Sequence, residues 1–106
     1  MAEKTLKKRR NPKLPVNIIR PSIIIGAIND PLPGWTDTFS AAGGLTLAGG
    51  MGIVNYVNGD GSNIADLVPV DYVSNIIITA TAIYANKPVL NVIHMGTSHQ
   101  NPITWY

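Results

Sequence analysis

Two aspartates, Asp66 and Asp71, lie close enough along the chain to form a general acid and base pair. Asp71, however, directly precedes a long apolar run, where an aspartate is a preferred N-cap of a helix. We therefore predict that Asp71 caps a helix and that Asp66 accepts hydrogen bonds from buried donors nearby. On this interpretation the two carboxylates hold the fold together and do no acid and base chemistry.

The histidines offer neither a metal site nor a base for a nucleophile. His94 and His99 are five residues apart with no carboxylate between them, whereas a metal site needs three or four ligands. Ser98 stands beside His99, but nothing around it resembles the sharp strand-to-helix turn of a nucleophilic serine. The sequence also has no cysteine, which excludes a thiol nucleophile and a thiolate zinc site. We expect no metal ligand and no catalytic residue in this chain.

Paired glycines could cradle a phosphate, but they stand in the wrong context. The run Gly49-Gly50-Met51-Gly52 precedes a short apolar segment, Ile53 to Val57, that is typical of a strand. A phosphate-binding glycine motif instead lies between a buried strand and a helix. We therefore interpret these glycines as part of a flexible loop.

Positive charge is concentrated in the first tenth of the chain. Residues 1–13 carry six of the eight basic residues and one acid, so the remaining residues are net negative. No aromatic residue lies among these cations to stack on a base, which argues against a nucleic-acid partner. We predict a helix over residues 2–10, whose last turn carries cations and which Asn11-Pro12 ends.

The remaining pattern is that of an α/β protein. Within 106 residues of 11.3 kDa, the apolar and β-branched segment 16–25 predicts a buried strand of a parallel sheet. Because Pro21 has no N–H, the regular strand should stop near Arg20 and continue as an extended segment. Ligands of open α/β sheets bind at the carboxyl ends of such strands.

Three further segments complete the predicted organisation. Residues 29–68 are rich in turn-forming residues and form an irregular insert, with short extended pieces at 53–57 and 64–68 that resemble a small hairpin. Residues 71–86 combine β-branched side chains with helical spacing, and their length favours a helix. Residues 89–94 predict a last strand. None of the apolar stretches is long enough to cross a bilayer.

The order of these segments and their motifs resembles the fatty acyl-CoA reductases, within the extended short-chain dehydrogenase/reductases. The resemblance covers nearly the whole chain and rests on three separate stretches in the right order: Ile19-Arg20-Pro21-Ser22-Ile23 running into Pro31 to Asp37, then Ala65 to Asp71, then Asn101 to Trp105. It implies the carboxyl-terminal half of a Rossmann-like, doubly wound parallel sheet, so residues 1–106 are expected to be part of a reductase domain.

Two elements of that family have no counterpart in these residues. The nucleotide-binding glycine motif and the catalytic Tyr-x-x-x-Lys pair lie upstream of the matched segment, and three tyrosines here lack a lysine four positions later: Tyr56, Tyr72 and Tyr84. We therefore expect the chain to be a fragment of a longer protein or a truncated gene product. A noncatalytic remnant or interaction module of the same fold is the alternative.

The resemblance also implies which residues border the ligands. NADPH is the implied cofactor, with Pro21, Ser22 and Ile23 beside its nicotinamide, and a long-chain acyl-CoA is the implied substrate. Pro33, Gly34 and Trp35 would bind that substrate. Residues 31–52 would line the acyl pocket, with apolar side chains such as Leu45, Leu47 and Met51 in its walls.

Ala65 separates this chain from the related sugar-nucleotide epimerases and dehydratases, which favour an arginine there to bind a pyrophosphate. Another extended reductase or epimerase remains the alternative enzyme. The resemblance further implies a peroxisomal or endoplasmic-reticulum membrane location, through regions outside these residues. Finally, an incomplete parallel sheet is expected to leave apolar surface and a strand edge open, which favours self-association.

Overall fold

The computed structural model describes residues 1–39 and 41–105, so positions 40 and 106 of the expected domain lie outside the described residues. The described part is a mixed α/β chain with two small parallel sheets. Its elements, in chain order, are α1 (Ala2–Arg9), β1 (Val16–Pro21), β2 (Ile23–Ile25), α2 (Ala41–Gly50), β3 (Leu67–Pro69), α3 (Val70–Tyr84) and β4 (Leu90–Met95).

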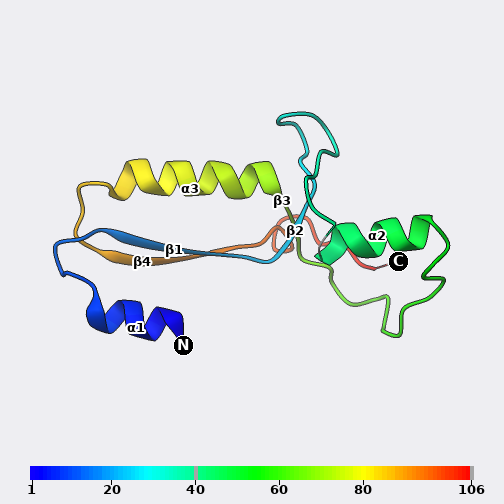
Figure 1. Ribbon diagram of the computed structural model, residues 1–106, viewed down its shortest axis with the longest axis horizontal. Helices are drawn as coiled ribbons and strands as arrows, with labels where there is room; N and C mark the ends of the chain where they lie inside the picture. The colour runs from blue at the N-terminus through cyan, green and yellow to red at the C-terminus, as the bar shows by residue number, and fades with distance from the viewer. Residues whose placement is uncertain (40, 106) are drawn as a thin grey trace.

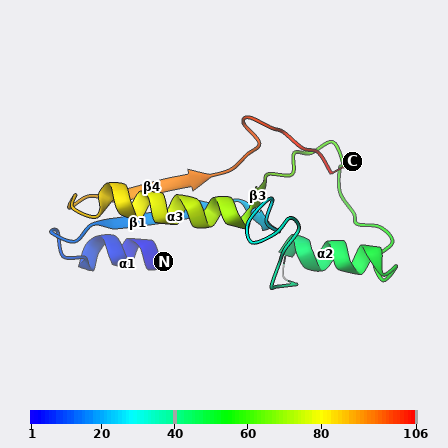
Figure 2. The same ribbon diagram turned by 90° about the horizontal axis from the view of Figure 1, so that it is seen from above.

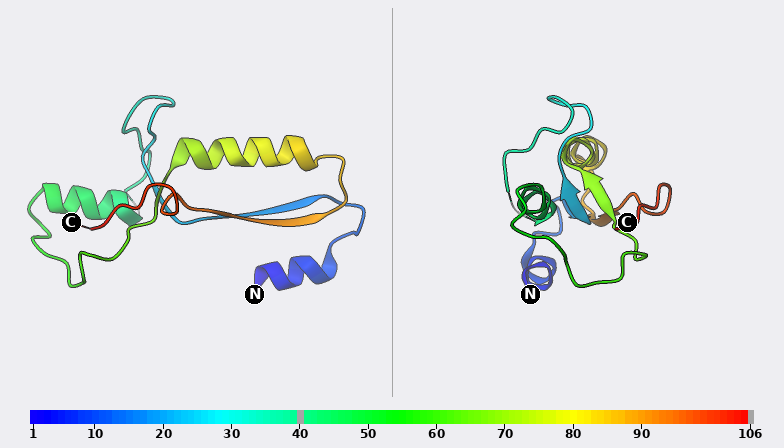
Figure 3. Two further views of the ribbon diagram at one scale, coloured as in Figure 1. Left: turned by 180° about the vertical axis from the view of Figure 1, so that it is seen from behind. Right: turned by 90° about the vertical axis from the view of Figure 1, so that its right-hand side faces the viewer.

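The larger sheet pairs β1 with β4 in parallel, from Val16 opposite Leu90 to Pro21 opposite Met95. Parallel neighbours need a crossover, and α3 supplies it along one face of the sheet while α1 lies below the other face (Figure 1). The view along the molecule shows the strands between these two helices (Figure 3). Helices on both faces of a parallel sheet are the arrangement of a partial Rossmann-like fold, as predicted.

The expected single strand over residues 16–25 is divided into two strands that belong to different sheets. Pro21 ends β1, the Ser22 N–H still donates to the Met95 carbonyl at 2.9 Å, and the Ile23 N–H donates to the Asp66 carbonyl at 3.0 Å. The chain thus changes its pairing partner between Ser22 and Ile23, and β2 pairs with β3. The prediction of burial is also corrected, because every residue of β1 and β2 is at least partly exposed.

Helix α3 shows that length and spacing outweigh β-branched propensity here. Val73 and Ala80 are buried on the face toward the sheet, and the Asn17 side chain of β1 donates from Nδ2 to the Ala80 carbonyl at 3.3 Å. Asn91 of β4 donates in turn to Oδ1 of Asn17 at 3.1 Å, so this polar chain joins both strands to the helix. Just after the end of α3, the Lys87 ammonium lies 5.3 Å from the centre of the ring of Tyr84, the last residue of the helix.

The insert over residues 29–68 differs most from expectation. It contains the ten-residue helix α2, and the glycines predicted to form a flexible loop instead end that helix. Gly52 has a φ of 72°, and the N–H groups of Ile53 and Gly52 donate to the carbonyls of Ala48 and Gly49, which is the Schellman arrangement. Residues 53–57 form no strand, and Ile64 makes an isolated antiparallel bridge to Thr104, so the expected hairpin is absent from the described residues.

The core of the described residues is small and the outline is long. Five apolar residues are buried, namely Ala27, Ala65, Val68, Val73 and Ala80, and only Val68 is a large fully buried side chain. The principal extents are 52 × 31 × 26 Å, and α2 stands well away from the β1–β4 sheet when seen from above (Figure 2). Among the described helices, none combines the length and apolar character needed to span a membrane.

Candidate functional site

The candidate site lies at the carboxyl ends of β1 and β4, where β2 begins. Ser22 stands between the two sheets, its hydroxyl is shielded from solvent, and it meets no partner at hydrogen-bond geometry. The same hydroxyl lies near enough to the Asp66 carboxylate to favour its ionised form. Pro21 and Ile23 flank Ser22 as the last residue of β1 and the first of β2. The three expected cofactor residues therefore occupy the point where the strand changes sheets.

Asp66 fastens the segment after β4 to this point. Its Oδ1 accepts the N–H groups of Thr97 at 2.9 Å and Ser98 at 3.0 Å. The hydrogen bond from the Ser98 backbone is the main cause that lowers the pKa of Asp66. Together with a smaller contribution from the Thr97 backbone, it outweighs the opposing effect of burial. The Thr97 hydroxyl adds a bond of 2.6 Å to the Leu67 carbonyl. The predicted role of Asp66, accepting from nearby donors, is confirmed.

Asp71 fastens the loop after β2 and is not the N-cap of α3. The helix begins at Val70 with Pro69 as N-cap, so the predicted N-cap position of Asp71 is wrong, although its Oδ1 accepts the first-turn N–H of Tyr72 at 3.2 Å. Its carboxylate, only 8% exposed, accepts the backbone N–H groups of Ile28 at 3.3 Å, Asn29 at 3.0 Å and Asp30 at 3.4 Å. Burial works against ionisation, but these backbone donors outweigh it and lower the pKa of Asp71.

A mainly apolar cavity of about 1060 Å³ opens beside these anchors. It brings together Ser22 and Ile23 from the expected cofactor side with Gly34 and Trp35 from the expected substrate side. Pro21 and Pro33 are not among its lining residues, and of the three aliphatic side chains expected to line it, Leu47 does so while Leu45 and Met51 do not. Helix α2 forms part of the wall, because it carries Leu47.

Phe39 lines this cavity within the expected range 31–52, whereas Val70 and the segment Ile24 to Ile28 line it without having been predicted. Val70 was not predicted as a lining residue because the helix was expected to start one residue later, at Asp71, whereas Val70 is its first residue. An error of one residue in the predicted start of the helix therefore left a lining residue of the cavity unpredicted.

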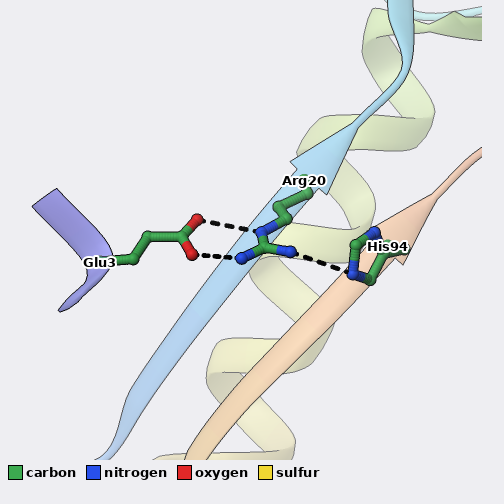
Figure 4. Close-up of polar contacts among 3 residues, drawn as sticks. All are labelled: Glu3, Arg20 and His94. Atoms are coloured by element: carbon green, nitrogen blue, oxygen red, sulfur yellow. Dashed lines mark hydrogen bonds and ion pairs between the residues drawn. The ribbon is translucent and has the colours of Figure 1, made fainter. Parts of the chain in front are cut away.

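A polar cluster holds α1 against the end of β1 (Figure 4). The Arg20 guanidinium donates to both carboxylate oxygens of Glu3, with a distance of 3.0 Å from Nε to Oε1. Its Nη1 lies 3.3 Å from Nε2 of His94, the residue opposite Arg20 in the parallel register. The hydrogen bond to Arg20 lowers the pKa of Glu3, and the same bond raises the pKa of Arg20. Both side chains are nearly half exposed, which marks a surface contact.

Within the described residues, no group of three or more histidine or carboxylate side chains could hold a metal ion. The two predicted anchoring carboxylates are occupied by backbone donors, and His94 faces Arg20. What the site offers is therefore an apolar wall, a shielded hydroxyl and a rigid set of backbone contacts at a strand end. Such a place can orient a ligand, and Asp37 is the one acidic side chain among the residues that line it.

Parallel strands covered by helices on both faces, with a cavity at their carboxyl ends, define this chain as part of a Rossmann-like α/β domain. Residues 1–77 match the family of NAD-binding domains described as male sterility protein, and the chain belongs to that family.

Fatty acyl-CoA reductases are found among its relatives. "Probable fatty acyl-CoA reductase 5" of Arabidopsis thaliana is 36% identical over 106 residues, which are 99% of this chain and 21% of the relative. "Fatty acyl-CoA reductase 1" of Homo sapiens is 41% identical over 96 residues, covering 88% of this chain and 18% of the relative. The resemblance seen in the sequence motifs is thereby confirmed. The chain spans about one fifth of the length of these curated relatives.

Proposed function

We propose that this chain forms the carboxyl-terminal part of the cofactor-binding domain of an NADPH-dependent reductase that converts long-chain fatty acyl-CoA to fatty alcohol. The observation that carries this proposal is the cavity that Ser22 and Ile23 line together with Gly34 and Trp35. Membership of an NAD-binding family and relatives named fatty acyl-CoA reductases support the reaction class.

The cofactor part of the proposal concerns the nicotinamide. A nicotinamide ring has an apolar face and a polar carboxamide, and Ile23 offers apolar surface while the Ser22 hydroxyl is shielded and lacks a partner at hydrogen-bond geometry. These residues therefore fit the ring, with Pro21 holding the backbone that leads to them. When bound, NADPH supplies the hydride. The role of this chain is to orient the ring and to exclude water at the end of the strand.

The substrate part of the proposal concerns the acyl chain. A cavity of about 1060 Å³ is at the upper end of the usual range for small-molecule sites, and its lining is mainly apolar. Asp37 is the one acidic side chain among the lining residues and no basic side chain accompanies it there, so the lining offers no cation to the phosphates of coenzyme A. The cavity thus suits the hydrocarbon tail rather than the nucleotide end of the substrate, with Gly34 and Trp35 in contact with the tail and Pro33 shaping their turn.

The location proposed for the whole protein rests on the family resemblance alone. We propose that it works at a peroxisomal or endoplasmic-reticulum membrane, and that association with the membrane uses regions outside residues 1–106.

A chimeric enzyme tests the proposal. The matched segment of human fatty acyl-CoA reductase 1 is replaced by the corresponding residues of this chain, and NADPH-dependent reduction of palmitoyl-CoA is followed, with analysis of the product. We expect the chimera to reduce palmitoyl-CoA to the alcohol. We also expect Trp35→Ala to impair the chimera by raising its KM for palmitoyl-CoA. Tyr56→Ala is the matched control, because Tyr56 is 90% exposed and does not line the cavity. A folded chimera that binds neither NADPH nor palmitoyl-CoA would refute the proposal.

A further inference from the structure

We propose that Asp71 is a positioning residue for the acyl cavity: by holding the backbone of residues 28–30, it sets the place of Trp35 in the cavity wall. The identity of the ligand, an acyl chain, rests on the proposed function above. The placement of Trp35 rests on contacts within the chain alone.

Asp71 is held firmly at the start of α3. It lies in the first turn of α3, next to Val70, which lines the cavity, and Val73 in the same turn is buried against the sheet. Both carboxylate oxygens are engaged. Oδ1 accepts the N–H groups of Ile28 and of Tyr72 in its own helix, and Oδ2 accepts those of Asn29 and Asp30. Because the Asp71 side chain is fixed by its helix and shielded from water, it can hold the backbone of the loop in one position.

Backbone hydrogen bonds within the loop set its shape. The Ala27 N–H donates to the Trp35 carbonyl at 2.9 Å, and the Gly34 N–H donates back to the Ala27 carbonyl at 2.8 Å. The Trp35 N–H donates to the Leu32 carbonyl at 3.1 Å and closes a tight turn. Gly34 in this turn has a φ of 80°, a conformation that favours glycine. Close packing adds to this, because a Cβ built at Gly26 would lie 3.1 Å from the Trp35 carbonyl oxygen.

These two sets of contacts have different consequences. The bonds between Ala27 and residues 34 and 35 join the loop to itself, so they preserve its shape without placing it against α3. The bonds to Asp71 cross more than forty residues of sequence and connect the loop to the helix that bears Val70. Because Val70 and Trp35 line the same cavity, the Asp71 carboxylate fixes one wall relative to another.

The test uses the 106-residue chain with Trp105→Phe, which leaves Trp35 as its single tryptophan. Asp71→Asn places an amide NH₂ group against backbone donors, so it weakens the attachment with little change of size. We expect greater quenching of Trp35 fluorescence by acrylamide, and an affinity for palmitoyl-CoA reduced by about fivefold or more. Asp60→Asn is the matched control, since Asp60 accepts bonds from Ser62 in an exposed turn, and it should change neither quantity.

The measurements are made at a protein concentration where the chain sediments as a monomer, and far below its unfolding temperature. Unchanged Trp35 quenching in a variant with unaltered far-ultraviolet circular dichroism would overturn the proposal. If Asp71→Asn does not fold, Asn29→Pro removes the best-placed donor and leaves Asp71 intact, and the same rise in quenching is expected. If the parent chain does not bind palmitoyl-CoA, the acyl part of the proposed function fails, while the quenching experiment still decides the role of Asp71.

Discussion

Gly96, directly after β4, packs against the carboxylate of Asp66 so closely that a side chain at position 96 would collide with Oδ2. The carboxylate cannot swing aside freely, because its Oδ1 holds the N–H groups of Thr97 and Ser98. We predict that Gly96→Ala lowers the free energy of unfolding by about 1–3 kcal/mol, the usual cost of overpacking, as measured by chemical denaturation.

Gly59→Ala is the control for this substitution. A Cβ built at Gly59 meets no heavy atom within 4 Å, so a methyl group there should change stability very little. If the two alanine variants proved equally stable, the tight packing of Gly96 on Asp66 would be contradicted.

The two anchoring aspartates predict how stability depends on pH. Both have a pKa below the ordinary value of 3.8 in the folded chain, Asp66 mainly through the Ser98 backbone, and Asp71 because backbone donors outweigh its burial. A carboxyl whose pKa is lower when folded stabilises the protein fully at pH values above its unfolded pKa. That contribution is lost as the pH falls through the folded pKa. We therefore expect the melting temperature to fall steeply below about pH 4.

Asp71→Asn separates this effect from general acid unfolding. The variant should have a lower melting temperature at neutral pH and a flatter decline at low pH, because one linked proton has been removed. Asp60→Asn should flatten the curve less, since its carboxylate is held by Ser62 alone in an exposed turn. Parallel curves for the parent and Asp71→Asn would show that Asp71 does not contribute to the acid response.

Elements with a local signal could be predicted from the sequence. Helix α3 and strand β4 follow from length, spacing and a proline boundary, and they occur as Val70–Tyr84 and Leu90–Met95. The role of Asp71 could not be predicted, because its donors lie more than forty residues earlier and a local pattern favours a cap. The change of sheet at Ser22 likewise depends on where Asp66 presents its carbonyl.

The residues around the cavity could likewise be predicted only in part from the sequence. Ser22, Ile23, Gly34 and Trp35 were proposed as ligand neighbours through family resemblance, and the structure places them in one cavity. Helix α2 escaped prediction because four of its ten residues are glycine, which lowers helix propensity. The only sequence signal at the end of α2 is a glycine cluster. The role of Gly52 as a helix cap is shown by the hydrogen bonds from the N–H groups of Gly52 and Ile53 to the carbonyls of Gly49 and Ala48.

The end of α2 yields a prediction in which neighbouring glycines respond in opposite directions. Gly52 has a φ of 72°, so Gly52→Ala should cost about 1–2 kcal/mol of unfolding free energy, the penalty of left-handed backbone for a residue with a Cβ. Gly50 is the last residue of the helix and has open space around it, so Gly50→Ala should leave stability unchanged or raise it by up to about 1 kcal/mol. Chemical denaturation of both variants checks the sign, and equal effects would contradict the Schellman cap.

The shape of the described chain predicts association of the purified 106-residue polypeptide. Its Cα radius of gyration is 17.1 Å, whereas a compact domain of this length has about 13 Å. Its accessible surface is 8118 Å², against about 5,700 Å² expected for a folded monomer of 11.3 kDa. That excess is larger than a protein–protein interface of standard size, about 1,600 Å² in total.

Much of the excess is apolar and lies on the secondary structure. Ile24 of β2, Val92 of β4 and Ile78 of α3 are 40%, 43% and 66% exposed. At about 25 cal/mol per Å² of apolar surface, covering a few such side chains contributes several kcal/mol, which is comparable to the whole stability of a small domain. Within the described residues β1 also has β4 as its one paired neighbour, so its other edge offers unpaired backbone groups. Sedimentation velocity over a wide concentration range should therefore show reversible self-association or a broad thermal transition, whereas a single monomeric species that unfolds sharply at every concentration would contradict it.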